Sequence, residues 1–317
     1  MELTLALAHK IAGLSIIIFL GFLTVRLGVL RFEDSKALST FALYVLTPCA
    51  MLDAFQYPFS ADKLSGMGVS LLACLIAVAV FALLTLPAKR LLHLSVVETC
   101  SLEYPNAGNF MIPLISSVMG GEALIYLSPC FLMMNIFLFT HGQAVLSGVK
   151  KFSFSVFYKN VVLVSVFLGF LLFLLGWQLP GILGETVSSL GGMMGPIYMF
   201  TVGMILGNAD LKRVFTNRRA YGICLGRLLI YPLVTLLVLC LCGIFRIHPQ
   251  AREIITVVVL SAGAPAAVLV TQLTQLYRSE EEAQFASSVN IMSTLLCLLT
   301  MPVLSWLYQQ LAGRIGT

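Results

Sequence analysis

"YPNAGNFMIP", residues 104–113, and "SAGAPAAVL", residues 261–269, are the two stretches that decide the fold. Each lies inside an apolar run, and their prolines, Pro105 and Pro265, are 160 residues apart. Proline removes a backbone donor and clashes with the preceding helical turn, while lipid offers no water to an unpaired backbone amide. Two such breaks in apolar surroundings therefore need a reason, which the rest of the sequence supplies.

The composition indicates a membrane protein. The chain has 317 residues, of which 59% are hydrophobic and 10% charged, and its mean hydropathy is +0.98. A soluble domain carries about 25% charged residues. Apolar runs of roughly 20 residues recur along the whole chain, each long enough to cross the hydrocarbon core. We therefore expect an all-α polytopic membrane protein in contact with the lipid bilayer.

The charged residues and cysteines exclude several partners. The net charge is +5, but the basic residues are scattered between apolar runs, so no nucleic acid is expected to bind. The eight cysteines form no CxxC pair, which argues against a metal site or a disulfide framework. No cofactor is predicted.

Charge clusters and turn residues divide the chain into ten predicted spans. The run after Lys10 is interpreted as the first span rather than a cleaved signal peptide, because it is too long for one. The ten spans are 10–30, 37–57, 67–87, 95–119, 123–146, 160–179, 187–208, 221–244, 253–276 and 283–308.

The basic residues predict the orientation of these spans. The odd-numbered loops carry thirteen lysines and arginines, whereas the even-numbered loops and the termini carry five. The positive-inside rule then places the odd loops in the cytoplasm and both termini outside. The expected location is a cell membrane, with the bacterial inner membrane as its type.

A weak internal repeat predicts the architecture. A shift of 160 residues aligns spans 4–5 with spans 9–10 through seven identities: Ser101, Pro105, Ala107, Glu122, Ala123, Ser128 and Thr140 with Ser261, Pro265, Ala267, Glu282, Ala283, Ser288 and Thr300. The chain is thus interpreted as a first repeat, 1–146, a cytoplasmic linker, 147–159, and a second repeat, 160–317. Because five is odd, the second repeat enters the membrane inverted, as is typical of secondary transporters.

The two breaks are expected to meet near the bilayer midplane. Pro105 lies about eleven residues into its span, or ~16 Å deep at 1.5 Å per residue, and Pro265 reaches a similar depth from the opposite face. Gly108 and Gly263 permit unusual backbone angles. Each break begins a new half-helix whose amides and positive dipole end favour an anion. The alternative is a pair of kinks that pack against neighbouring helices and bind no ligand.

The residues around both breaks resemble a known family. "PNAGNFMIPL", "GGEALIYL" and "APAAVLVTQLTQLYRSEEEAQFASSVNIMSTLLCLLTMPVLSWL" are similar to the auxin efflux carriers, whose bacterial members include malate and malonate permeases. The resemblance covers essentially the whole chain. It implies a 5+5 inverted-repeat fold of the elevator type, in which spans 1, 2, 6 and 7 form a scaffold and spans 3–5 and 8–10 a transport domain.

The resemblance also implies site residues. The crossover positions of the family correspond here to Pro105, Asn106 and Gly108 in span 4 and to Ala264 and Pro265 in span 9. Plant members have an asparagine beside the second proline and a long loop between the halves. This chain has alanines around that proline and a short linker, which argues against auxin as its substrate.

Two ionisable residues inside the membrane need an explanation, because each costs ~2.5–3.5 kcal/mol at a helix centre. Glu103 lies at the end of a half-helix, where both burial and the dipole favour its protonated form. Arg227 lies at about the same depth in span 8. Three interpretations remain open: an Arg227–Glu103 ion pair, a solvated cavity wall, or coupling of transport to H⁺ or Na⁺ through Glu103.

The predicted substrate site combines the two breaks with polar residues at similar depth. Its members are Pro105, Asn106, Gly108, Asn109, Asn135, Ser261, Ala264, Pro265, Thr271 and Asn290. Pro48 and Pro196 are expected to break two scaffold helices in the same way. The GxxxG patterns at Gly191 and Gly203 predict close helix packing within the scaffold or at a homodimer interface.

The function predicted from these features is a secondary transporter that moves a small organic anion, such as malate or malonate, by alternating access. An intramembrane enzyme is not expected, because the sequence lacks HExxH and a paired nucleophile and base. The remaining alternatives are a channel, a receptor derived from a transporter, or a sodium-coupled carrier of another solute class.

Overall fold

The protein is all-helical in its described part. A computed structural model describes residues 2–108, 110–148 and 160–315, and within these ranges the only β structure is one isolated bridge. The first half contains α1 (Glu2–Arg26), α2 (Asp34–Phe41), η1 (Ala42–Leu46), α3 (Thr47–Asp53), α4 (Ala61–Leu91), α5 (Val96–Glu103), α6 (Met111–Met119), η2 (Gly121–Ala123), α7 (Leu124–Phe137), η3 (Leu138–Gly142) and α8 (Gln143–Ser147).

The rest of the described chain is also helical. It contains α10 (Val161–Leu174), α11 (Gly181–Asn208), α12 (Leu211–Thr216), α13 (Arg218–Leu225), η4 (Gly226–Ile230), α14 (Tyr231–Leu241), η5 (Ile244–Arg246), α15 (Ala251–Ala262), α16 (Val268–Tyr277) and α17 (Glu280–Ile315). Most of the predicted linker, residues 149–159, lies outside the described residues.

Seven described helical segments are long and apolar enough to cross a membrane. The apolar helix α10 is shorter, at 14 residues. The two predicted spans that contain Pro105 and Pro265 are each divided into half-helices, α5 with α6 and α15 with α16. The chain is therefore a multi-pass α-helical membrane protein. The count of ten spans in two inverted sets of five stays a prediction.

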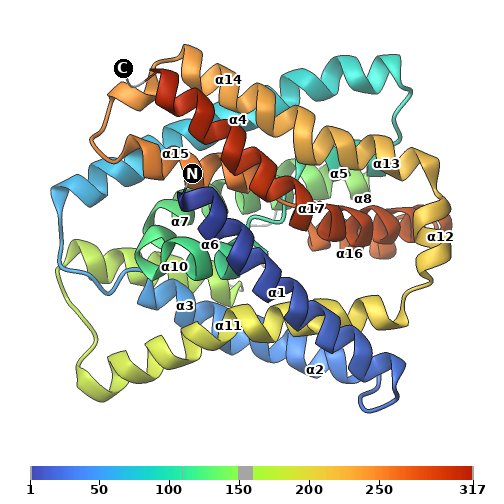
Figure 1. The fold of residues 1–317 in the computed structure, drawn as a ribbon, viewed down its shortest axis with the longest axis horizontal. Helices are drawn as coiled ribbons and strands as arrows, with labels where there is room; N and C mark the ends of the chain where they lie inside the picture. Colours follow the sequence, from blue (N-terminus) through green and yellow to red (C-terminus); the bar gives the residue numbers. More distant parts are fainter. Residues whose placement is uncertain (1, 109, 149–159, 316–317) are drawn as a thin grey trace.

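The helices gather into two groups (Figure 1). In the lower half of that view α11 packs against α3 and α2, and α10 packs against α3. In the upper half α4 packs against α14 and α15, and it also contacts α7. Helix α1 crosses α11, while the long α17 contacts α13, α15 and α16. Of the half-helices of the two breaks, α15 belongs to the upper group, and α6 lies between the two groups in this view (Figure 1).

Glycines permit the closest helix contact, between α1 and α11. A Cβ added at Gly203 would collide with the carbonyl oxygen of Ile18, and one at Gly21 with that of Phe200. Gly191 packs in the same manner against α3, because a Cβ added at Gly191 would lie 3.0 Å from the Cα of Ala50. The GxxxG patterns therefore serve packing within the chain, as one of their two interpretations predicted.

The predicted breaks at Pro48 and Pro196 are wrong. Pro196 lies inside the continuous helix α11. Pro48 follows the π-helical turn η1, and the hydroxyl of Thr47 donates to the carbonyl of Ala42 at 2.8 Å. The π-helical turn and the Thr47 hydroxyl together compensate for the amide that Pro48 lacks, so the helix continues without a break.

Candidate functional site

The two breaks cross and satisfy each other's backbone. The amide of Asn106 donates to the carbonyl of Pro265 at 2.8 Å, and the amide of Ala267 donates to the carbonyl of Tyr104 at 2.9 Å. These two bonds make an antiparallel bridge between Pro105 and Ala266. An unpaired amide in the membrane interior costs several kcal/mol, so each break supplies what the other needs.

Two side chains of helix α17 bind the backbone of the second break. Asn290 Nδ2 donates to the carbonyl of Ala266 at 2.7 Å, and the Ala266 amide donates to Ser293 Oγ at 3.1 Å. Asn290 was predicted to bind substrate, but in this arrangement its amide nitrogen binds backbone. Ser293 was not predicted. The sequence signal that could have identified Ser293 is its position one helical turn after Asn290, which places both residues on the same face of the helix.

Arg227 binds the carboxyl-terminal ends of α5 and α15, and does not form the Arg227–Glu103 ion pair that was one of the three interpretations open from the sequence. The guanidinium donates from Nη1 to Leu102 O at 2.7 Å, from Nη2 to Ala262 O at 2.6 Å and from Nε to Ala264 O at 3.0 Å. Within the described part of the chain no carboxylate lies within 4.0 Å of it. Carbonyls at a helix end already carry partial negative charge, so they replace the expected carboxylate.

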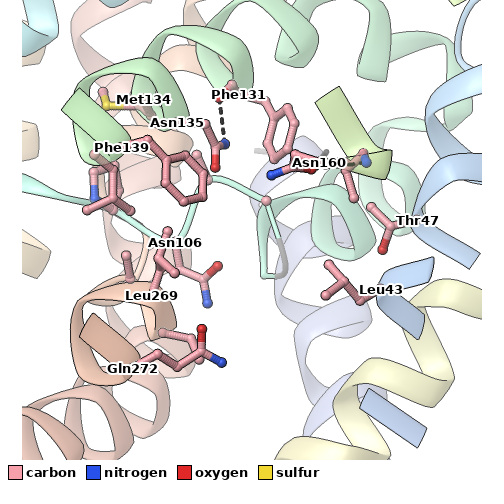
Figure 2. Close-up of a pocket in the computed structure, with 17 residues that line it drawn as sticks. Leu43, Thr47, Asn106, Phe131, Met134, Asn135, Phe139, Asn160, Leu269 and Gln272 are labelled. Carbon is pink, nitrogen blue, oxygen red and sulfur yellow. Dashed lines mark hydrogen bonds between the residues drawn. The ribbon is translucent and has the colours of Figure 1, made fainter. Parts of the chain in front are cut away.

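A cavity of about 180 Å³ lies beside the crossing. Figure 2 shows Asn106, Gln272 and Asn135 on one side of it and Thr47, Leu43 and Asn160 on the other. The described residues that line it are Leu43, Thr47, Pro105, Asn106, Ala107, Gly108, Phe131, Met134, Asn135, Leu138, Phe139, Asn160, Val162, Ala267, Val268, Leu269 and Gln272. The cavity therefore lies between the two helix groups.

Four of the predicted substrate residues line this cavity, namely Pro105, Asn106, Gly108 and Asn135. Asn135 also donates from Nδ2 to Phe131 O of its own helix, at 2.8 Å. Asn109 lies outside the described residues.

The other predicted residues do not line the cavity. Ser261 is buried and its hydroxyl donates to Val257 O at 2.7 Å. Ala264 and Pro265 contribute only carbonyls to the crossing, and Thr271 is not among the lining residues. The side chain that α16 contributes is the next residue, Gln272.

Several lining residues were not in the predicted set. Thr47 comes from α3 and Asn160 precedes α10, and the carboxamide oxygen of Asn160 caps α10 by accepting from Val162 N at 3.1 Å. An asparagine just before an apolar run is a sequence signal for such a cap. Nothing in the sequence indicates that this cap also lines a cavity.

The cavity is lined by uncharged groups and lies close to two helix starts. None of its described lining residues carries a charge. Helix α16 begins at the cavity, where Ala267, Val268 and Leu269 are lining residues, and α6 begins three residues after the lining residue Gly108.

The residues at the cap positions of α6 and α16, Phe110 and Ala267, have no polar side-chain atom for capping. At α6 the Ile112 amide donates to Gly108 O at 3.0 Å and Pro113 has no amide, so the free amides are mainly those at the start of α16. A helix start carries roughly +0.5 of an elementary charge.

Glu103 lies at a second cavity, of about 190 Å³, on the other side of Tyr104. Its carboxylate is 3.9 Å from His141 Nδ1, and the Tyr104 hydroxyl is 2.5 Å from the same nitrogen. Met134 lines both cavities. Glu103 is therefore close to the crossing but separate from the cavity that holds Asn106.

Comparison with known proteins identifies the family of the chain. No protein of curated function matches the chain. The family described as "membrane transport protein" matches over residues 6–153 and 150–305, which together include nearly the whole chain. This multi-pass helical protein therefore belongs to the membrane transport protein family, that of the auxin efflux carriers, and is a membrane transporter.

Proposed function

We propose that the chain is a secondary carrier that moves a small organic anion, such as a mono- or dicarboxylate, by alternating access. The observation that carries this proposal is the cavity at the crossing. It has two helix starts beside it, carboxamide groups for hydrogen bonding and, among its described lining residues, no acidic side chain to repel an anion.

The distribution of dipoles strengthens the argument. The crossing brings together two helix ends and two helix starts. Arg227 binds carbonyls at both ends, which neutralises their negative charge. At the start of α16 no cap side chain binds the free amides, whereas at the start of α6 the Ile112 amide already donates to Gly108 O and Pro113 has no amide. The remaining potential at the cavity is positive, so an anionic group is attracted to it.

The proposed moving parts follow from the two sides of the cavity. Spans 1, 2, 6 and 7 would form the scaffold, and spans 3–5 and 8–10 would form the transport domain, in two repeats at 1–146 and 160–317. Thr47 and Asn160 belong to the former, whereas Asn106 and Gln272 belong to the latter. A substrate between them would be exposed to one side of the membrane when one group shifts against the other. In this proposal both termini lie outside, and a homodimer would form through the scaffold.

The experiment is uptake into proteoliposomes that contain the purified protein. A panel of labelled mono- and dicarboxylates is supplied at two pH values, with and without sodium. A carrier gives saturable uptake that is stimulated by unlabelled substrate on the opposite side. Non-saturable flux without such stimulation would support a channel, and no uptake of any carboxylate would refute the proposal.

A matched pair of variants locates the site. Gln272 and Gln275 are both exposed glutamines of α16, but only Gln272 is among the lining residues. Gln272→Leu removes a hydrogen bond to a charged group, worth ≈1.5–3 kcal/mol, so the KM of uptake should rise about 10- to 150-fold. Gln275→Leu should leave it unchanged. Equal effects of both changes would place the substrate elsewhere.

A further inference from the structure

Arg227 is the largest fully buried side chain in the described part of the protein. Among the described residues its guanidinium forms no ion pair and binds only groups without a formal charge. Its three backbone acceptors come from two helices that are more than 150 residues apart in the chain: Leu102 of α5, and Ala262 and Ala264 at the end of α15. The ring of Phe81 lies over the guanidinium at 4.8 Å.

The local backbone is built to place this side chain. Arg227 lies in the π-helical turn η4, and such turns are frequent at functional sites. The preceding Gly226 leaves room for Leu102, whose Cδ2 would lie 2.8 Å from an added Cβ. Two contacts therefore hold this turn against the end of α5, namely the packing of Gly226 against Leu102 and the hydrogen bond from Arg227 to the Leu102 carbonyl.

The charges balance at this point. A helix end carries roughly −0.5 of an elementary charge, so the ends of α5 and α15 together carry about −1. The guanidinium carries +1 and does not lose its proton in proteins. One permanent cation therefore neutralises both ends, with no acidic side chain involved among the described residues.

Unwound carbonyls at the middle of broken helices are the groups that hold a coupling sodium ion in secondary transporters. Here Leu102, Ala262 and Ala264 would offer such a cluster of oxygens, but all three accept from Arg227. We propose that Arg227 is a resident cation of the crossing, which takes the place of a coupling sodium ion, so that transport proceeds without sodium.

This inference has one part that rests on the proposed function, the sodium independence of transport, and one part that does not, the replacement of a cation. The second part is tested on purified protein without any substrate. Arg227→Ala empties the space of the guanidinium and leaves three carbonyls at two negative helix ends.

We expect Arg227→Ala to lower the melting temperature of the purified protein by roughly 5–10 °C, since an unpaired buried network costs several kcal/mol in a chain of this size. Guanidinium chloride at low millimolar concentration should recover more than half of that loss, and sodium a smaller part. Choline, which donates no N–H group, should recover none. The matched control is Arg278→Ala, because Arg278 also binds two carbonyls, those of Val145 and Leu146, but outside the crossing.

Two results would overturn the inference. The first is that Arg227→Ala melts at the temperature of the wild type, or that guanidinium raises its melting temperature no more than that of Arg278→Ala. If Arg227→Ala cannot be purified, the wild type decides: its melting temperature and uptake should be the same in sodium and in potassium. The second result that would overturn the inference is that the stability or the transport of the wild type requires sodium. If no carboxylate is transported at all, the melting experiments still stand, so the two failures are distinguishable.

Discussion

Gly108→Ala gives the sharpest test of the crossing, because the space there is filled by one identified side chain. A Cβ at Gly108 would lie 2.6 Å from Phe131 Cε2 and 3.2 Å from Cδ2. Carbon atoms in contact prefer ≈3.5–4.0 Å, so the ring must move by roughly 1 Å. Phe131 is only 5% exposed, and the open space beside it is the cavity that it lines.

The expected cost is that of overpacking, about 1–3 kcal/mol. The assay is the unfolding midpoint of purified protein, measured beside Gly68→Ala. Gly68 lies in α4, and no described atom lies within 4 Å of a Cβ added there. The control should gain about 0.4–1 kcal/mol, because alanine restricts the unfolded chain. The same chemical change should therefore have opposite signs at the two glycines.

A double mutant separates this contact from other causes. Phe131→Leu removes the ring atoms that an alanine at 108 would meet, so Gly108→Ala should cost less than about 1 kcal/mol in that background. The displaced ring should also raise the KM of uptake, because it moves into the cavity. The reasoning is refuted if Gly108→Ala is as stable as the wild type, or if its cost is the same with leucine at 131.

Three further outcomes are expected. Asn290→Leu leaves the buried carbonyl of Ala266 without its side-chain donor, so the unfolding free energy should fall by about 1–3 kcal/mol. Glu103→Gln keeps the shape of the side chain but removes its ionisation, so uptake should lose its dependence on pH if Glu103 carries a coupled proton, while the melting temperature is retained. Gly203→Ala should lower the yield of folded protein, because its Cβ meets the backbone of Ile18, which cannot move as a side chain can.

Each of these has a control and a contradicting result. Thr294→Val, one turn beyond Asn290, should cost less than Asn290→Leu because Thr294 only donates to its own helix. His141→Gln, which removes the imidazole 3.9 Å from the Glu103 carboxylate, should alter the pH profile of a protein with Glu103 but not that of Glu103→Gln. Gly192→Ala should express normally, since no described atom lies near its added Cβ. Equal losses at Gly192 and Gly203 would refute the packing argument.

The sequence predicted the two breaks because their physical cause is local. Pro105 and Pro265 each follow an apolar run and precede small residues, and both helices end before them. The same reasoning failed at Pro48 and Pro196. Whether a proline ends a helix depends on how neighbouring turns pair the carbonyls it leaves free, as Thr47 does for Ala42. A single sequence gives no sign of that pairing.

The site was predicted less completely than the breaks. Depth in the membrane selected Asn106 and Asn135, which line the cavity, but it could not distinguish Thr271 from Gln272, which differ only by a rotation about the helix axis. Depth also suggested that Arg227 pairs with Glu103. Their shared depth is explained by a common neighbour, the end of α5, to which Arg227 binds through Leu102 while Glu103 faces His141.

The two hydrogen bonds that tie Tyr104 to Ala267 and Asn106 to Pro265 make each half of the chain depend on the other for folding. A separately produced half would leave a backbone carbonyl and an amide unpaired in its interior, at several kcal/mol each. Two genes that encode residues 1–153 and 154–317 should therefore give stable protein only when expressed together. An ancestor with one half alone could have been stable only as a pair of copies, in which each subunit completed its neighbour's backbone.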